Sequence, residues 1–337
     1  MNTNGVIVTQ KLSATIVFLF SIANLYGQAI VQGKIINSRT KEVIQYANIG
    51  IMGANVGTIS NPDGSFSLSI PDKMLSDTLV FASIGYEKRS IALTQIFGDQ
   101  SLIIYLNENV MELSPVIISS RKVKSGTFQL GNPDFKGGVL ETDTLYAGRS
   151  ISLLIDDKSA GDNKGLTFPA YLENARLRIF KNNLKSCKFR IRINSVNKAT
   201  GQPADDLLNE SIVVESTMRK GWMVFDLSKL NIEIFESFFL TFEQILDVTD
   251  RSLIADDYAK FMREHPDRLQ IDCVEVDGKK EVREVIKRGG IDLAGTFIGI
   301  ATSKTARERY TCYVRETSFG EWKKVYGIVA ATVTCSK

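Results

Sequence analysis

The chain has 337 residues, of which 44% are hydrophobic and 23% charged; this composition is typical of a folded protein with about two domains. Lys and Arg number 41 against 38 Asp and Glu, so the formal net charge is +3. So small an excess argues against the concentrated basic face of a nucleic-acid-binding protein, and we predict no nucleic-acid partner.

The N-terminal segment has the pattern of a secretory signal peptide. Lys11 precedes an apolar run over residues 12–23, which is short for a bilayer span but suits the hydrophobic region of a signal. The small residues Gly27 and Ala29 fit cleavage after Ala29, and cleavage after Gln28 is the alternative. We therefore predict that residues 1–29 are a signal peptide rather than an uncleaved anchor. We expect export to the periplasm or the outer-membrane surface, with no membrane span after signal cleavage.

Residues 30–108 have the pattern of a small β-sandwich. Short β-branched or alternating runs occur at residues 31–36, 46–52, 56–60, 65–70, 78–83, 89–93 and 101–106. The sequence Asn61-Pro62-Asp63-Gly64 is a strong turn signal, because proline restricts φ early in a turn and glycine accepts a positive φ. This spacing of strands and turns predicts a seven-stranded Ig-like or prealbumin-like β-sandwich.

Four stretches of this segment resemble the carboxypeptidase-regulatory-like domain that begins many exported proteins of Bacteroidetes-type bacteria. They are residues 31–35 (VQGKI), 46–49 (YANI), 57–66 (GTISNPDGSF) and 79–86 (LVFASIGY). The resemblance covers about 80 residues and implies a domain that assists folding or interaction. The domain accompanies peptidases without carrying their catalytic site.

Residues 109–124 have the composition of a linker, and a similar run leads into the plug and barrel of large outer-membrane receptors. The chain has only 217 residues after residue 120, without the long array of alternating strands that such a barrel needs. We therefore do not expect a receptor.

Residues 125–337 predict a second, jelly-roll-like β-sandwich with a helical insertion. Its strand-like runs are residues 150–155, 175–180, 188–196, 210–214, 221–227, 236–245, 291–301, 310–316 and 321–333. In the run from Lys188 to Ile193 the apolar residues are expected inside, and Lys188, Arg190 and Arg192 outside. Residues 247–270 have helical spacing that ends at His265-Pro266. Residues 172–177, 189–193, 201–208 and 221–228 resemble a jelly-roll or galactose-binding-like module.

The sequence contains no recognisable catalytic constellation. His265 is the single histidine, so neither a Ser-His-Asp triad nor a zinc peptidase site is expected. We predict no catalytic, cofactor-binding or metal-binding residues, and no cofactor. Carboxylates that could form a glycosidase-type pair, but that are expected in turns or on the surface, are Asp205, Asp206, Asp226, Asp256 and Asp257.

A few other residues leave alternatives open. Asn61 and Asp63 resemble half a calcium loop, although a plain hairpin turn is the expectation. Trp222 and Trp322 lie beside turns and are expected either in the core or as stacking platforms for sugars. Four cysteines allow three disulfide connectivities, and their strand-like surroundings favour a bridge between Cys273 and Cys312, with free thiols as the alternative. These residues are Cys187, Cys273, Cys312 and Cys335.

Together these patterns predict a non-enzymatic exported binding or interaction protein of the cell envelope. Its expected partner is a glycan or an envelope protein. The alternative is a carboxylate-dependent hydrolase in the C-terminal module.

Overall fold

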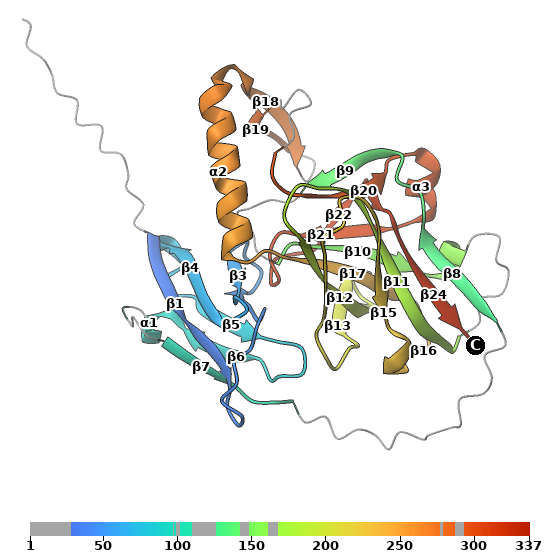
Figure 1. The fold of residues 1–337 in the computed structure, drawn as a ribbon, viewed down its shortest axis with the longest axis horizontal. Coiled ribbons are helices and arrows are strands. Elements are labelled where there is room, and N and C mark those ends of the chain that lie inside the picture. The colour runs from blue at the N-terminus through green and yellow to red at the C-terminus, as the bar shows by residue number, and fades with distance from the viewer. Residues whose placement is uncertain are drawn as a thin grey trace, which may run out of the picture.

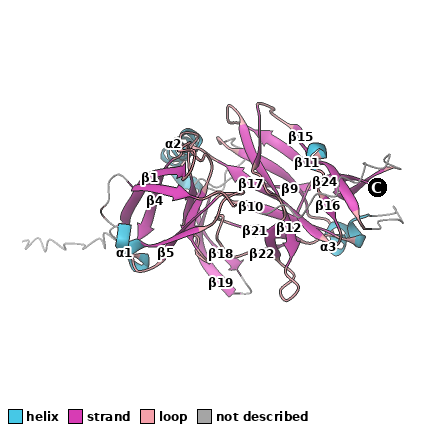
Figure 2. Cartoon of the chain, turned by 90° about the horizontal axis from the view of Figure 1, so that it is seen from below, coloured by secondary structure: helices cyan, strands magenta, loops and turns pink. Residues whose placement is uncertain are grey.

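The computed structural model describes residues 28–96, 98, 102–109, 126–141, 148–160, 168–276, 279–286 and 293–337. The chain is mostly β, and two β-sandwich modules lie beside each other (Figures 1 and 2). Residues 1–27 of the predicted signal peptide and residues 110–124 of the predicted linker lie outside the described residues. The division into domains therefore stays a prediction. Within the described ranges, no helix is both long and apolar enough to cross a membrane.

The N-terminal module contains two facing sheets. One sheet has the order β4 (Ser65–Pro71), β1 (Gln28–Asn37), β7 (Leu102–Leu106). The other has the order β3 (Gly57–Ile59), β2 (Asn48–Ile51), β5 (Thr78–Ala82), β6 (Arg89–Ala92). In β4 the predicted alternation is present, with Phe66, Leu68 and Ile70 buried, and these side chains face the core between the sheets. The predicted β-sandwich therefore fits this segment.

Gly33 allows β1 and β7 to approach each other. A Cβ atom at residue 33 would lie 2.2 Å from the carbonyl oxygen of Leu102, which is closer than any side chain tolerates. The parallel pairing of β1 with β7 begins at this residue, with Gly33 opposite Leu102. A glycine is therefore required here for close approach of two backbones. The short helices of this module are η1 (Asp72–Met74) and α1 (Leu93–Ile96).

The C-terminal module is a larger sandwich whose two inner faces share one apolar core. Its first sheet has the order β13 (Pro203–Asp206), β12 (Cys187–Val196), β17 (Phe238–Ile245), β10 (Ser150–Ile155), β21 (Cys312–Arg315), β22 (Lys323–Val325), and β14 (Ile212–Ser216) also pairs with β12. Its second sheet has the order β23 (Ile328–Val329), β20 (Thr296–Ala301), β11 (Ala170–Asn182), β24 (Ala331–Ser336), β8 (Thr127–Asn132), joined by β9 (Gly137–Glu141), β15 (Gly221–Asp226) and β16 (Glu233–Ile234). The jelly-roll character of this module stays a prediction.

The predicted helical insertion is confirmed as α2 (Val248–Glu264). The side chain of Asp247 caps it by accepting a hydrogen bond from the Asp250 amide at 3.0 Å. The helix ends at Glu264, next to the predicted end at His265-Pro266, and Pro266 begins a short 3-10 helix. The elements that follow are η4 (Pro266–Arg268), β18 (Leu269–Val276) and β19 (Lys279–Ile286). The remaining helices of the module are η2 (Asp157–Ala160), η3 (Ser228–Leu230) and α3 (Lys304–Arg309).

The outer face of β12 differs from its prediction. Phe189, Ile191 and Ile193 face the sandwich core, as their alternation predicts. The expectation of solvent exposure for Lys188, Arg190 and Arg192 is wrong, since each is less than a tenth exposed. The physical reason is that the N-terminal module and the start of α2 cover this face of the sheet.

The predicted bridge between Cys273 and Cys312 is also wrong. Cys312 is a free, buried thiol, as are Cys187 and Cys335, whereas the side chain of Cys273 lies outside the described residues. Burial raises the pKa of Cys187 to about 11 and those of Cys312 and Cys335 to about 12. These three thiols therefore remain protonated and unreactive at neutral pH.

Candidate functional site

Arg190 connects the two modules from the centre of β12. Its Nη1 donates to the side-chain oxygen of Asn48 at 3.1 Å, and its Nη2 donates to the carbonyl of Tyr46. On its own module, Nε donates to Ser211 Oγ at 2.9 Å and Nη1 contacts Glu243 at 3.3 Å. The side chain is 1% exposed, and an unpaired guanidinium would be costly at that burial. The junction between the modules is therefore a packed, hydrogen-bonded interface.

The first turn of α2 adds contacts to the same interface. The backbone amide of Val248 donates to Asn61 Oδ1 at 3.2 Å, and Arg251 Nη1 donates to Thr58 Oγ1 at 2.9 Å. In Figure 1 the helix stands at the boundary between the two modules. The insertion thus helps to hold the N-terminal module in place.

A loop after β21 completes the interface on its other side. Thr317 Oγ1 donates to the carbonyl of Ala54 at 3.1 Å, and the amide of Gly53 donates to the carbonyl of Phe319 at 2.9 Å. A Cβ at Gly50 would lie 3.0 Å from Phe319 Cδ2, so the glycine leaves room for the Phe319 ring. The two modules therefore fit against each other closely on this side.

Beside this interface lies a cavity of about 660 Å³ to which both modules contribute. We call it the interdomain cavity, and its lining includes Asn48, Lys88, Arg192, Asn194, Arg315 and Trp322. Its volume falls within the range of small-molecule sites, roughly 300–1,000 Å³. Unlike most such sites, its wall is rich in charged and amide groups.

Glu243 is the central anion beneath this cavity. It is fully buried and accepts hydrogen bonds from Arg192 Nε at 2.6 Å and Ser318 Oγ at 2.9 Å, besides its contact with Arg190. Burial alone would raise the pKa of Glu243, but Arg192, Arg190 and Arg315 together lower it to about 2. The carboxylate therefore stays ionised and orients the arginines around it.

Sheet register explains why these groups meet. Arg190 on β12 is opposite Glu243 on β17, Glu243 is opposite Ser150 on β10, and Ser150 is opposite Arg315 on β21. Residues opposite each other in adjacent strands project from the same face of a sheet. Four strands thus place one row of polar side chains beneath the N-terminal module.

Asp206 holds the second arginine of the site. Its Oδ2 lies 2.9 Å from Arg192 Nη1, and its Oδ1 accepts from the backbone amide of Leu208 at 3.1 Å. Burial raises the pKa of Asp206, and the charge of Arg192 opposes that rise. Arg192 is therefore fixed between two carboxylates, Asp206 and Glu243.

Arg315 is stacked on Trp322 at the wall of the cavity. The guanidinium carbon is 4.5 Å from the centre of the indole ring, and Nε donates to Ser150 Oγ at 3.4 Å. Burial and the like charge of Arg192 lower the pKa of Arg315 to about 10. Arg315 is still a cation at neutral pH, and the aromatic face beneath it stabilises that charge.

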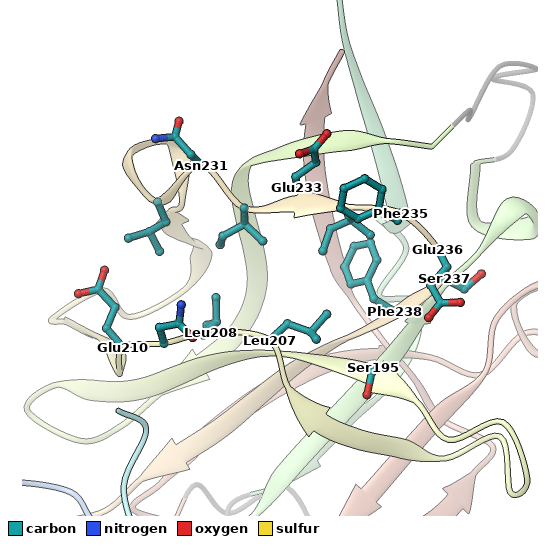
Figure 3. Close-up of a pocket in the computed structure, with 14 residues that line it drawn as sticks. Ser195, Leu207, Leu208, Glu210, Asn231, Glu233, Phe235, Glu236, Ser237 and Phe238 are labelled. Atoms are coloured by element: carbon teal, nitrogen blue, oxygen red, sulfur yellow. The ribbon is translucent and has the colours of Figure 1, made fainter. Parts of the chain in front are cut away.

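A second cavity, of about 750 Å³, lies on the other side of the segment that follows β13. Leu208 and Asn209 line both cavities. Figure 3 shows the rings of Phe235 and Phe238 next to each other, with Leu207 below them and the carboxylate of Glu233 pointing upward, away from Leu207. We call this the apolar cavity, because leucine, isoleucine and phenylalanine side chains form much of its wall.

The predicted carboxylates are not gathered in one site. Asp205 and Asp206 line the interdomain cavity. Asp226 instead accepts from the amide and hydroxyl of Ser228 at 3.0 and 2.7 Å, and these bonds lower its pKa. Asp257 accepts from the Ala294 amide at 2.6 Å, and Asp256 is exposed on α2. Of these carboxylates, the adjacent pair on β13 lines one of the two cavities described above.

The other predicted residues have structural roles. Asp63 Oδ1 accepts from the Ser65 amide at 3.0 Å within the hairpin turn, which fits the expected plain turn. His265 ends α2 and is partly buried, with its ring 5.0 Å from that of Phe261. Within the described part of the chain, no group of three or more His, Cys, Asp or Glu residues could hold a metal ion.

The two tryptophans have similar surroundings in different sheets. Trp222 on β15 lies under Arg176, whose guanidinium carbon is 5.0 Å from the ring centre. Trp322 lies under Arg315, and both tryptophans are partly exposed rather than in the core. Of the two, Trp322 alone is among the residues that line the interdomain cavity.

Sequence reasoning missed the arginines of the site. Two signals were available: Arg190 and Arg192 alternate along a strand with few nearby carboxylates, and Glu243 lies within an otherwise apolar and uncharged strand, FFLTFEQI. A lone carboxylate in such a strand indicates a buried partner of opposite charge. The partner strand could not be identified from spacing alone.

The fold defines a class of protein, namely two packed β-sandwich modules with a polar cavity at their junction. The family model of the CarboxypepD_reg-like domain matches residues 31–118, so the chain carries this domain in its N-terminal part. No curated protein is similar enough to the chain to count as a match.

One solved structure similar to the chain contains the cysteine protease and lectin-like domains of Cwp84, a surface layer associated protein of Clostridium difficile. The two are 7% identical, with a TM-score of 0.34, over 92% of this chain. The chain spans 63% of the length of that structure.

Proposed function

We propose that the chain is a non-enzymatic binding protein, exported to the cell envelope, and that its ligand is a glycan held in the interdomain cavity. The CarboxypepD_reg-like domain fits a binding module, and the N-terminal sequence has the signal-peptide pattern described above. The location would be the periplasm or the outer-membrane surface.

The observation that carries the proposal is an aromatic ring among fixed polar groups in one cavity. Trp322 lines the interdomain cavity together with Asn48, Asn194 and Arg192. An indole ring packs against the apolar face of a sugar, while amides and charged groups hydrogen-bond its hydroxyls. Arg190 and Glu243 do not line the cavity, but they hold the lining residues of the two modules in place. The cavity is therefore largely formed before a ligand enters.

The test is binding of the purified full chain to an array of oligosaccharides, followed by titration calorimetry of the best ligand. We expect Trp322→Ala to weaken that binding by about tenfold, because the lost apolar contact area and the lost stacking together contribute about 1.4 kcal/mol. The matched control is Trp222→Ala, which removes the equivalent ring from the other sheet and should leave affinity unchanged.

Two results would contradict the proposal. One is the absence of binding to any oligosaccharide. The other is recovery of an envelope protein whose binding, unlike that of sugars, depends on Trp322. That second result would replace the glycan by a protein partner at the same cavity.

A carboxylate-dependent hydrolase is the second candidate, because burial raises the pKa of Asp206 in this cavity and Asp205 is its neighbour. A general acid needs a raised pKa. This candidate predicts release of new reducing ends from a bound oligosaccharide, and loss of that release in Asp206→Asn. Binding without release favours the non-enzymatic proposal.

A further inference from the structure

Among the described residues, Arg315 forms no direct ion pair, although Glu243 and Asp206 attract its charge from a distance. The buried cluster contains Arg190, Arg192 and Arg315 but two carboxylates, Glu243 and Asp206. Both carboxylates contact Arg190 or Arg192. Among the described residues, Arg315 has the contacts with Ser150 and Trp322 alone, and neither engages Nη1 or Nη2.

The geometry of Arg315 suits a planar anion. Its Nε is directed at Ser150 and one face of its guanidinium lies against Trp322. The two terminal nitrogens keep their N–H groups for another acceptor, and a carboxylate accepts from such a pair in a bidentate arrangement. Binding of an anion there would also relieve the repulsion between Arg315 and Arg192.

Asn194, which lines the same cavity, carries a buried acceptor without a partner among the described residues. The residue is 6% exposed, and its Nδ2 donates to the carbonyl of Ala204 at 3.2 Å, which fixes the orientation of the amide. Its Oδ1 is buried and finds no donor among the described residues. A buried acceptor normally has a partner, so Asn194 indicates a ligand that carries a donor, such as a hydroxyl group.

We infer that the interdomain cavity binds an acidic sugar, with the carboxylate of a uronic-acid-type residue on Arg315 and a hydroxyl group donating to Asn194 Oδ1. This inference rests on the proposed glycan-binding function and names the class of glycan. Arg315 covers one face of the Trp322 ring, and we assign contact with the C–H face of the same sugar to the part of this partly exposed ring that Arg315 leaves open.

The other charges of the cavity are compatible with an anion. Asp206 is neutralised by Arg192 at 2.9 Å. Asp205 and Lys88 also line the cavity, are both exposed and carry opposite charges, so they add no net charge. Arg315 is therefore the cation in this cavity whose terminal N–H groups are available to an anionic ligand.

Acidic sugars fit these groups better than two other carriers of negative charge. A phosphate group at neutral pH offers mainly acceptors and leaves Asn194 Oδ1 without a donor. The C-terminus of a peptide offers a carboxylate and an N–H donor, but it lacks the flat C–H face that a tryptophan binds. One molecule that combines a carboxylate, hydroxyl donors and such a face is a uronic acid.

The test compares oligogalacturonate and oligoglucuronate with the same oligosaccharides after reduction of their carboxyl groups. Calorimetry on the full chain should show at least about tenfold tighter binding of the acidic forms, because hydrogen bonds to charged groups are the stronger ones. Arg315→Met should abolish this preference while the neutral forms still bind. Arg315→Lys should keep part of this preference, because lysine keeps the positive charge but cannot form the bidentate hydrogen bonds of a guanidinium.

Arg176→Met is the matched control, since Arg176 also lies over a tryptophan, on the other sheet; it should keep the preference for acidic forms. Thermal unfolding of each variant verifies that it is folded.

Equal affinity for acidic and neutral forms, with both dependent on Trp322, would overturn the acidic-sugar inference and leave the glycan function intact. Absence of binding to any sugar would overturn the glycan function itself. If a peptide with a free C-terminus bound through Arg315 and the acidic sugars did not, the site would be a peptide site and the inference would be wrong.

Discussion

At the scale of single residues, charge pairing beneath the interdomain cavity is the most specific feature. Glu243 is fully buried and ionised, and it neutralises one of the arginines around it. A buried carboxylate is stable only when cations and hydrogen bonds replace its water. The orientation of Arg190 and Arg192 therefore depends on Glu243 being ionised.

This dependence predicts how stability responds to acid. The pKa of Glu243 is about 2 in the folded chain against an ordinary value of 4.5. Because the folded value is depressed, the stabilisation is present above pH 4.5 and is lost as pH falls from 4.5 toward 2. We expect the free energy of unfolding to fall across that window. In Glu243→Gln the fall should be shallower, although this variant is less stable at neutral pH.

Urea unfolding at several pH values between 3 and 6 measures both slopes. Glu264→Gln is the control, because Glu264 forms an exposed pair with Lys260 at 4.0 Å and such pairs contribute little. Identical slopes in Glu243→Gln and the unmutated chain would contradict the assigned role of Glu243.

At the scale of elements, β12 and α2 connect the sandwich to its surroundings. Lys188 on β12 donates to Asp247 at 3.1 Å and to Asp250 at 3.0 Å, and both acids belong to the start of α2. Burial lowers the pKa of Lys188, but these two hydrogen bonds raise it above its ordinary value overall. The insertion is therefore attached to the sheet through its first turn.

Removal of the cap of α2 tests this attachment. Asp247→Ala deletes the bond to the Asp250 amide and one of the two partners of Lys188. We expect a loss of about 2 kcal/mol in the free energy of unfolding, since a cap contributes roughly 1 kcal/mol and a partly buried charged bond adds a similar amount. Hydrogen exchange of the α2 amides should increase as well.

Ser303→Ala is the comparison, because Ser303 caps the short helix α3 through the Ala306 amide at 3.1 Å without an ion pair. Its loss should be about half as large. If both variants lost equal stability, Lys188 would not be the attachment that we describe.

At the scale of the whole molecule, the two sandwiches form one unit rather than two modules on a flexible tether. Arg190 contributes four polar contacts, two of them to the N-terminal module. The first turn of α2 and the loop after β21 contact the same module. The interdomain cavity exists only while this interface is closed, so binding and interdomain packing are linked.

We therefore predict a single cooperative unfolding transition for the unmutated chain. Arg190→Met removes the contacts between β12 and the N-terminal module, and it should lower the free energy of unfolding by about 3 kcal/mol, as for other broken buried pairs. Calorimetry of this variant should show two separated transitions. Affinity for the cavity ligand should fall at the same time, because the lining residues of the N-terminal module are no longer held against the C-terminal module.

Lys198→Met provides the control, because Lys198 forms an exposed pair with Glu236 at 3.7 Å and its loss should change neither quantity. Two transitions in the unmutated chain would show that the sandwiches unfold independently and would contradict this description.

Much of the fold was predictable from local patterns. The strands of the N-terminal module and the six runs between residues 150 and 245 coincide with observed strands to within a few residues, because strand alternation and turn residues are local properties. The exceptions are strands that lack such patterns, for example β13 and β9. These segments form strands because neighbouring strands provide their backbone hydrogen-bond partners, although their own residues lack a strand pattern.

Which side chains face the core of a sandwich was determined by the sequence itself, since alternation along a strand assigns each residue to one of two faces. What covers the second face was decided by tertiary structure alone. Arg190 and Arg192 have the pattern of solvent-facing residues, but both are buried, and Arg190 contacts a module more than 100 residues earlier in the chain. The candidate site arises at that junction, because its charges come from four strands and a second module that no local pattern brings together.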